Sequence, residues 1–125
     1  MTPKLFRVIL PVSDINQAEK FYSQVLQIPG KRVSPGRHYF DCDGTILACF
    51  DPKADGDGFD PTANPDHVYL AVGDLEATYV RAAAAGCEWI EKKIEVRPWG
   101  ERSFYARDPF GNPICFVDEK TVFRG

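Results

Sequence analysis

Residues 7–15 read Arg-Val-Ile-Leu-Pro-Val-Ser-Asp-Ile, and residues 67–75 read His-Val-Tyr-Leu-Ala-Val-Gly-Asp-Leu. Similar residues therefore recur 60 positions apart, with Asp14 matching Asp74. Each stretch alternates apolar residues, as a strand does, and then reaches an aspartate that can cap a helix. A repeat of this kind indicates that the chain consists of two copies of one small module.

The composition limits the classes of protein to consider. The chain has 125 residues, 44% hydrophobic and 26% charged, as in an ordinary globular domain. One module alone would bury too little apolar surface to be stable, so the two should pack on each other or on a partner chain. The net charge of −3 without a basic block argues against nucleic acid as a partner. No apolar run is long enough to span a membrane, so we expect no membrane partner.

The cellular setting follows from the N-terminus and the cysteines. The first residues lack the apolar core and cleavage site of a signal peptide. The four cysteines show no paired spacing, which favours reduced thiols over a disulfide framework. We therefore expect a cytoplasmic protein. These cysteines are Cys42, Cys49, Cys87 and Cys115.

The order of elements is predicted to be strand-helix-strand-strand-strand, twice. This is an α+β fold of two tandem βαβββ modules, with both helices outside curved sheets. Asp14 and Asp74 should cap the helices, Pro29-Gly30 should end the first and Gly86 the second. Asp43-Gly44 is typical of a two-residue hairpin. The predicted strands cover residues 5–12, 31–34, 38–42, 45–50, 67–73, 87–96, 103–107 and 113–118.

The two modules are expected to form a single domain. Residues 1–50 make the first module, residues 51–66 a linker, and residues 67–125 the second module. The linker is rich in proline, glycine and aspartate and has no periodicity, so we expect it to be solvated. Its aspartates lack the spacing and the closing glutamate of a calcium loop.

Several short motifs carry a family resemblance. They are Val12-Ser13-Asp14-Ile15 with Phe21-Tyr22, His67-Val68 with Val72-Gly73-Asp74-Leu75, Pro98-Trp99-Gly100, and Asp108-Pro109-Phe110-Gly111-Asn112. Nearly the whole chain thereby resembles the vicinal-oxygen-chelate superfamily of glyoxalase I, bleomycin- and fosfomycin-resistance proteins and extradiol dioxygenases. The resemblance implies that the two curved sheets form a cup for a small molecule, and that the protein is a homodimer.

The resemblance also implies four positions for a divalent metal, one on the first and one on the last strand of each module. Here these positions hold Arg7, Ala48, His67 and Cys115. Metal-binding members commonly have glutamate at the last-strand position of each module, where this chain has Ala48 and Cys115. Arg7 stays protonated and Ala48 has no donor atom. His67 and Cys115 give two ligands, whereas catalytic zinc usually takes three from the protein. We therefore expect no cofactor; if a divalent metal does bind, His67 and Cys115 are the candidate ligands.

Ligand-binding residues are expected on the cup wall. His67 is either a hydrogen-bonded wall residue or a catalytic general base. Cys115 is either a small buried side chain or, if it lies in a cavity beside His67, a nucleophile. Trp99 either stacks at a pocket mouth or pins its hairpin, and Glu91 and Glu101 are expected to be solvated. The predicted ligand-binding set is Arg7, Ile9, Ala48, His67, Tyr69, Trp99, Tyr105 and Cys115.

Three functions are compatible with these residues. The first is a protein that binds a small organic molecule in the cup without the family metal. The second is a metal-dependent lyase, isomerase or dioxygenase of the same superfamily. The third, a structural or partner-binding module, would explain a dimer but gives no reason for Arg7 and His67 in the cup. Arg7 shares a face with Leu5, Ile9 and Pro11. It should pair with a distant Asp or Glu of the chain, bind a carboxylate or phosphate, or extend to the solvated cup mouth.

Overall fold

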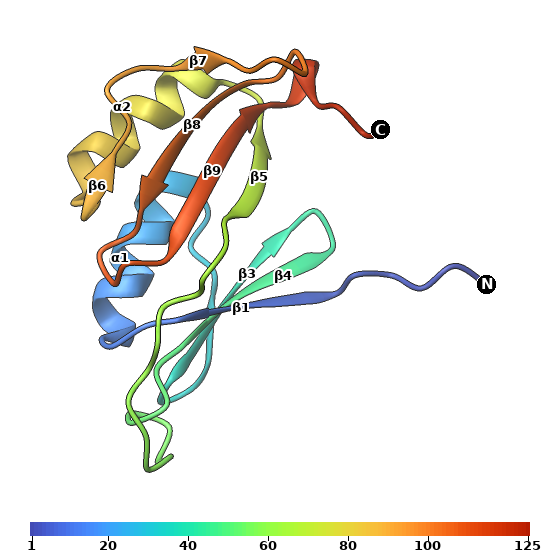
Figure 1. Cartoon of the computed structure of the whole chain (residues 1–125). Coiled ribbons are helices and arrows are strands. Elements are labelled where there is room, and N and C mark those ends of the chain that lie inside the picture. Colours follow the sequence, from blue (N-terminus) through green and yellow to red (C-terminus); the bar gives the residue numbers. More distant parts are fainter.

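Two small β-sheets, each covered on one face by one helix, make up the protein (Figure 1). The structure is a computed structural model that describes all 125 residues. It confirms the predicted α+β class. The first sheet and its helix comprise β1 (Arg7–Pro11), α1 (Ile15–Leu26), β2 (Lys31–Ser34), β3 (Arg37–Cys42) and β4 (Thr45–Phe50). The second sheet and its helix comprise β5 (Val68–Val72), α2 (Leu75–Ala85), β6 (Trp89–Ile90), β7 (Glu95–Val96), β8 (Arg102–Arg107) and β9 (Pro113–Asp118). A short 3-10 turn, η1 (Glu119–Thr121), follows.

Both sheets repeat one topology. Their strand orders are β1-β4-β3-β2 and β5-β9-β8-β6, with β7 also paired to β8. The first strand of each sheet runs parallel to the last, and all other pairs are antiparallel. The predicted strand at residues 87–96 is wrong in one respect, because it is divided into β6 and β7. Between them the Glu91 carboxylate, in place of a strand carbonyl, accepts the backbone N–H of Tyr105 at 2.9 Å.

The helix caps are as predicted. The Asp14 side chain accepts the backbone N–H groups of Asn16 and Gln17, and Asp74 accepts that of Ala77. Gly86 closes α2 with φ of 99°, a left-handed conformation that glycine adopts without strain. α1 ends slightly earlier than Pro29-Gly30, at Leu26, and the residue that caps it, Gln27, is left-handed. Neither helix is long and apolar enough to cross a membrane.

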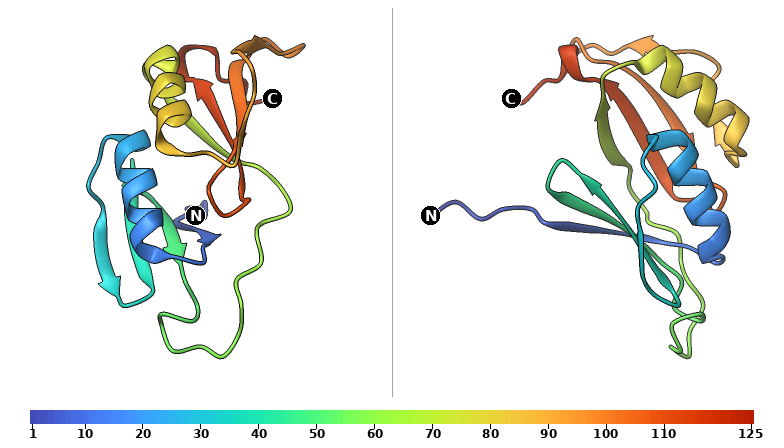
Figure 2. Two further views of the ribbon diagram at one scale, coloured as in Figure 1. Left: turned by 90° about the vertical axis from the view of Figure 1, so that its left-hand side faces the viewer. Right: turned by 180° about the vertical axis from the view of Figure 1, so that it is seen from behind.

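The two halves share one hydrophobic core. The helices lie side by side on the same side of the molecule (Figure 2), and the two sheets diverge from them (Figure 1). Sixteen buried residues form a single cluster that includes Phe21 and Phe40 from the first half and Phe104 and Phe116 from the second. The Arg81 side chain of α2 also donates to the Val25 carbonyl of α1 at 3.2 Å. Each half therefore completes the core of the other, as expected for modules of this size.

A buried polar network joins the halves at the Asp-Pro-Phe-Gly-Asn turn. The Tyr22 hydroxyl donates to Asp108 Oδ2 at 2.7 Å, across 86 positions of the chain. Asn112 Nδ2 donates to the same carboxylate at 3.0 Å and to the Pro11 carbonyl at 2.6 Å. Burial raises the pKa of Asp108, and the hydrogen bonds from Asn112 and Tyr22 oppose that rise. The network is the main polar link between α1, β1 and the second half.

The segment at residues 51–66 is more ordered than expected. Asp51 is buried, and the Asp55 carboxylate accepts from Ser34 Oγ at 2.6 Å and from the Gly36 backbone N–H at 2.9 Å. A Cβ atom at Gly36 would lie only 2.2 Å from the Asp51 carbonyl oxygen, so only glycine fits there. Further along, Asn64 Nδ2 donates to the Ile9 carbonyl of β1. Most of the segment is exposed, as expected for a solvated linker, but Asp51, Asp55 and Asn64 anchor it to the turns and edges beside it.

Replacing Tyr22 with phenylalanine tests the network between the halves. Tyr22→Phe keeps the ring but removes a donor to a buried carboxylate, so we expect a loss of about 1.5–3 kcal/mol in the free energy of unfolding. Urea denaturation measures this loss. Tyr39→Phe is the matched control: its half-buried hydroxyl only accepts from Arg37 at 3.3 Å, and a change within about 0.5 kcal/mol is expected. Equal effects of both substitutions would contradict the role given to Tyr22.

Candidate functional site

Each sheet has one face under its helix and one open face, and the candidate residues lie on the open faces. On β1, Leu10 is fully buried on the helix side, whereas Arg7 and Ile9 point the other way and are exposed. Cross-strand register places Ala48 beside Ile9, and Cys115 between Tyr69 and Tyr105. Strand alternation therefore assigns Arg7, Ile9 and Ala48 to the open face of the first sheet, and His67, Tyr69, Tyr105 and Cys115 to that of the second.

Arg7 lies on the open face of the first sheet without a charged partner. Its guanidinium carbon is 4.8 Å from the ring centroid of Phe6 and 5.2 Å from that of Tyr39. Arg7 takes part in no ion pair and no side-chain hydrogen bond. Its five N–H donors are therefore free for an anion. Ala48, in the same face, is buried and offers only a methyl group.

His67 and two tyrosines form an aromatic group on the second sheet. The His67 ring centroid lies 4.7 Å from that of Tyr105 and 6.2 Å from that of Tyr69. Partial burial and the nearby Arg107 charge lower the pKa of His67, so its imidazole is neutral at pH 7. Burial, together with Tyr105, raises the pKa of Tyr69 to about 12, which keeps its hydroxyl protonated.

Cys115 lies beneath these rings and is fully buried. Burial raises the pKa of its thiol to about 11, despite opposing contributions from Ser103 and Arg97. A protonated, inaccessible thiol is neither a nucleophile nor a ready metal ligand. The observed burial thus favours a packing role for Cys115.

The four positions where the family implies a metal give a poor donor set. Arg7 is a cation, Ala48 has no donor, and the Cys115 thiol is buried and protonated. His67 is left as the single ordinary donor. No three His, Cys, Asp or Glu side chains come together in a way that could hold a metal ion. These residues do not fit a family-type divalent metal.

An ion pair not foreseen from the sequence supports the second sheet. Arg97 donates to both carboxylate oxygens of Glu91, at 2.6 and 3.2 Å, and through Nε to Ser103 Oγ at 2.9 Å. Its guanidinium carbon is 4.4 Å from the Tyr105 ring centroid. The expectation that Glu91 is solvated was wrong. Its side chain is only 21% exposed, and that of Arg97 only 13%. This pair fixes Tyr105, which in turn contacts His67.

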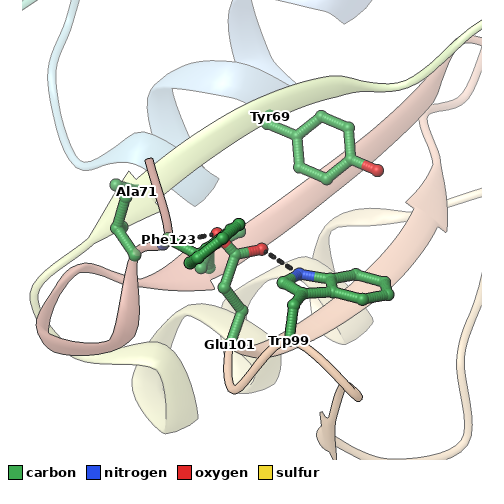
Figure 3. Close-up of a pocket in the computed structure, with 7 residues that line it drawn as sticks. Tyr69, Ala71, Trp99, Glu101 and Phe123 are labelled. Atoms are coloured by element: carbon green, nitrogen blue, oxygen red, sulfur yellow. Dashed lines mark hydrogen bonds between the residues drawn. The ribbon is translucent and has the colours of Figure 1, made fainter. Parts of the chain in front are cut away.

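A pocket of about 640 Å³ opens beside this aromatic group (Figure 3). Glu101 Oε1 accepts from the Trp99 indole N–H at 2.7 Å, and Oε2 from the backbone N–H of Phe123 at 2.9 Å. Both hydrogen bonds lie at the surface, so Glu101 stays in contact with solvent while it makes them. Its carboxylate holds both Trp99, on the turn before β8, and the C-terminal tail. The lining residues are Tyr69, Ala71, Trp99, Glu101, Val117, Val122 and Phe123.

The structure brings together only some of the predicted site residues. Tyr69 and Trp99 share the pocket, and His67, Tyr105 and Cys115 lie on the same open face. Arg7, Ile9 and Ala48 lie on the other sheet, and the ring contacts of Arg7, with Phe6 and Tyr39, stay within the first half. A groove of about 1020 Å³ separates the sheets, with Tyr69 and Ala71 on its second-sheet wall. Two pocket residues, Phe123 and Glu101, are absent from the predicted ligand-binding set. Phe123 could not be predicted, because nothing local in the sequence shows where the tail packs. Glu101 could have been included, because it belongs to the Pro-Trp-Gly-Glu turn that also carries Trp99.

The Glu91–Arg97 pair predicts an acid-dependent part of the stability. Burial alone would raise the pKa of Glu91, but the hydrogen bonds from Arg97 and Tyr105 lower it below the ordinary 4.5. Because the folded-state pKa is the lower one, the stabilisation is complete above pH 4.5 and is lost as the pH falls through the folded-state value. The difference in unfolding free energy between wild type and Glu91→Gln should therefore shrink below that pH, as measured by urea denaturation. Exposed Glu88→Gln is the control, and a Glu91→Gln difference that persists undiminished into acid would contradict the assignment.

The unpaired Arg7 predicts an anion site on the first sheet. Acetate, benzoate and phosphate should each raise the melting temperature of wild type more than that of Arg7→Met, because a bound anion stabilises only the folded state that holds it. Lys20→Met removes the same charge from the outer face of α1 and should behave like wild type. If the anions stabilise wild type and Arg7→Met equally, Arg7 is not the site.

Comparison with known proteins gives a consistent family. No curated protein sequence matches this chain. Among solved structures, a glyoxalase/bleomycin resistance protein from Albidiferax ferrireducens T118 is similar, at 23% identity and a TM-score of 0.78 over 90% of this chain and 97% of that one. Lactoylglutathione lyase from Agrobacterium tumefaciens is similar at 22% identity and a TM-score of 0.73, covering 95% of this chain and 96% of that one. TioX from Micromonospora sp. ML1 is similar at 20% identity and a TM-score of 0.67, covering 94% of this chain and 99% of that one.

At these identities the solved structures establish the fold alone. The family model is more direct: that of the Glyoxalase/Bleomycin resistance protein/Dioxygenase superfamily matches residues 4–116, nearly the whole chain. With the repeated sheet topology and the paired Asp caps, the match shows that this chain belongs to the glyoxalase/bleomycin resistance protein/dioxygenase superfamily.

Proposed function

We propose that this protein binds a small organic molecule on the open face of its second sheet, without the divalent metal of the superfamily's metal enzymes. The observation that carries the proposal is the pocket with three large aromatic walls, Tyr69, Trp99 and Phe123. These residues are 56%, 46% and 58% exposed, although large aromatic residues are usually mostly buried. Exposed aromatic rings grouped around a hollow are typical of a binding site rather than of a protein core.

The metal positions support binding without metal chemistry. Ala48 offers no donor, Cys115 is buried as a thiol, and Arg7 repels a cation. His67 alone is too few ligands for a catalytic zinc. Such a protein would act by sequestering its ligand in stoichiometric amounts, and its melting temperature would rise with ligand concentration by mass action.

We also propose that the protein is a homodimer. Leu5, Phe6 and Ile9 are 70%, 55% and 36% exposed at the start of β1, beside the open face of the first sheet. A second copy that covered these side chains would remove apolar surface from water. Light scattering is expected to report twice the chain mass, and a clean monomer at micromolar concentration would count against the dimer.

The alternative is a lyase, isomerase or dioxygenase of the same superfamily. One observation favours it: His67 is neutral at pH 7 and lies against Tyr105, so its imidazole is able to accept a proton from a bound substrate. Metal analysis separates the two functions. One divalent ion per chain that survives dialysis and disappears in His67→Ala would favour the metal-dependent enzyme.

Tryptophan fluorescence tests the binding function directly. The chain has two tryptophans, Trp89 and Trp99, and both are about half exposed, but only Trp99 lines the pocket. Compounds from a library of small aromatic and charged molecules that raise the melting temperature should lose about tenfold in affinity with Trp99→Leu, because stacking on one aromatic ring contributes roughly 0.5–1.5 kcal/mol beyond burial of its area.

Trp89→Leu is the matched control and should leave the affinity unchanged. The same variant keeps Trp99 as the single fluorescent reporter of binding. If no compound shifts the melting temperature except a metal ion, the proposed function is wrong.

A further inference from the structure

We propose that the pocket between Tyr69, Trp99 and Phe123 recognises an organic cation, a protonated amine or a quaternary ammonium group, with Glu101 as its counter-ion. The inference deepens the proposed function, which it presupposes, by naming the chemical class of the ligand. Figure 3 shows the arrangement on which it rests: the Glu101 carboxylate lies among the aromatic side chains of the pocket.

Glu101 carries a negative charge that no cation of the protein neutralises. Its two hydrogen-bond donors, the Trp99 indole and the Phe123 backbone N–H, are both neutral groups. None of the ion pairs in the structure includes Glu101. The same two hydrogen bonds lower the pKa of Glu101, so it is ionised at neutral pH. Each carboxylate oxygen keeps a lone pair free for a ligand donor.

The arginines that flank the pocket are already paired. Arg97 binds Glu91 and lies over the Tyr105 ring, and Arg102 binds Asp118 and Glu76. Neither is available to neutralise Glu101. The pocket lining itself contains one charged residue, Glu101, and no basic residue. Its electrostatic potential therefore favours a cation over an anion of the same shape.

The remaining walls select an organic cation over a hydrated metal ion. Aromatic ring faces carry the negative part of a quadrupole and attract ammonium groups at about 0.5–2 kcal/mol each. Ala71, Val117 and Val122 add methyl groups that contact alkyl substituents and offer no metal ligand. A carboxylate beside several aromatic faces thus suits a cation that has an apolar surface.

Three probes of related shape but different charge test the assignment. They are benzyltrimethylammonium, its uncharged carbon analogue neopentylbenzene, and benzoate. Titration calorimetry on wild type, with Trp99 fluorescence in the Trp89→Leu background as a second readout, should give about tenfold tighter binding of the ammonium than of the neutral analogue. Benzoate should not enter this pocket.

Two variants identify the counter-ion. Glu101→Gln keeps the size of the side chain but has one acceptor oxygen for the two donors Trp99 and Phe123, so any loosening of these walls affects both probes. Loss of the charge should weaken the ammonium about tenfold more than neopentylbenzene. Glu95→Gln removes the same charge from β7, outside the pocket, and should change neither. Unaltered ammonium binding by Glu101→Gln would overturn the assignment. If Glu101→Gln does not fold, the wild-type comparison still decides, because equal affinity for the charged and neutral probes is sufficient to reject it.

The outcomes separate this inference from the proposed function. Preferential binding of neopentylbenzene or benzoate in the pocket, lost in Trp99→Leu, would reject the cation and leave a small-molecule binding protein. Absence of binding by all three probes would also reject the cation. The proposed function itself fails only if the wider library contains no ligand either.

Discussion

The hydrogen bonds around the buried Asp108 carboxylate are the constraint on which the rest of the structure depends. Asp108 and Asn112 come from the turn between β8 and β9, Tyr22 from α1, and the Pro11 carbonyl from the end of β1. Three segments therefore meet around one ionisable group, the Asp108 carboxylate, whose desolvation is tolerated only while its partners stay in place. The shared apolar core supplies most of the stabilisation, but apolar contacts are not directional. The polar network specifies how the halves are oriented.

That orientation separates the packing faces from the chemical faces. With the two helices side by side, the apolar rows of both sheets point into one core, and the opposite faces are left without cover. Charged groups on the open faces are held by different means. Arg97 is paired and stacked, so it is part of the scaffold under Tyr105. Arg7 and Glu101 carry opposite charges, belong to different halves of the protein, and have no partner of opposite charge. A charged ligand therefore gains most by pairing with one of these two groups.

The sequence predicts what depends on local chemistry. The Asp14 and Asp74 caps, the left-handed Gly86 and the strand alternation on β1 all follow from interactions within a few residues, and so does the hairpin at Asp43-Gly44. What it does not predict depends on partners distant in the chain. The Glu91–Arg97 ion pair is one example, because it lies where β8 brings Tyr105 beside both residues. Likewise, the contact between Phe123 and Glu101 spans 22 positions and follows no periodicity. The positions of Arg7 and His67 on separate faces depend on how the halves pack, which no repeat in the sequence specifies.

The edges of the two sheets have a consequence for aggregation. A free strand edge is a template on which other chains add strands, so natural sheets shorten or interrupt their edges. Here the outer edges are β2, which has an irregular register near Arg32, and the two-residue strands β6 and β7. On β1 the free carbonyls of Ile9 and Pro11 already accept from Asn64 and Asn112. Only β5 keeps an uninterrupted edge of five residues. Ordered growth of one sheet onto another is thus restricted to a single strand, which lines the groove between the sheets.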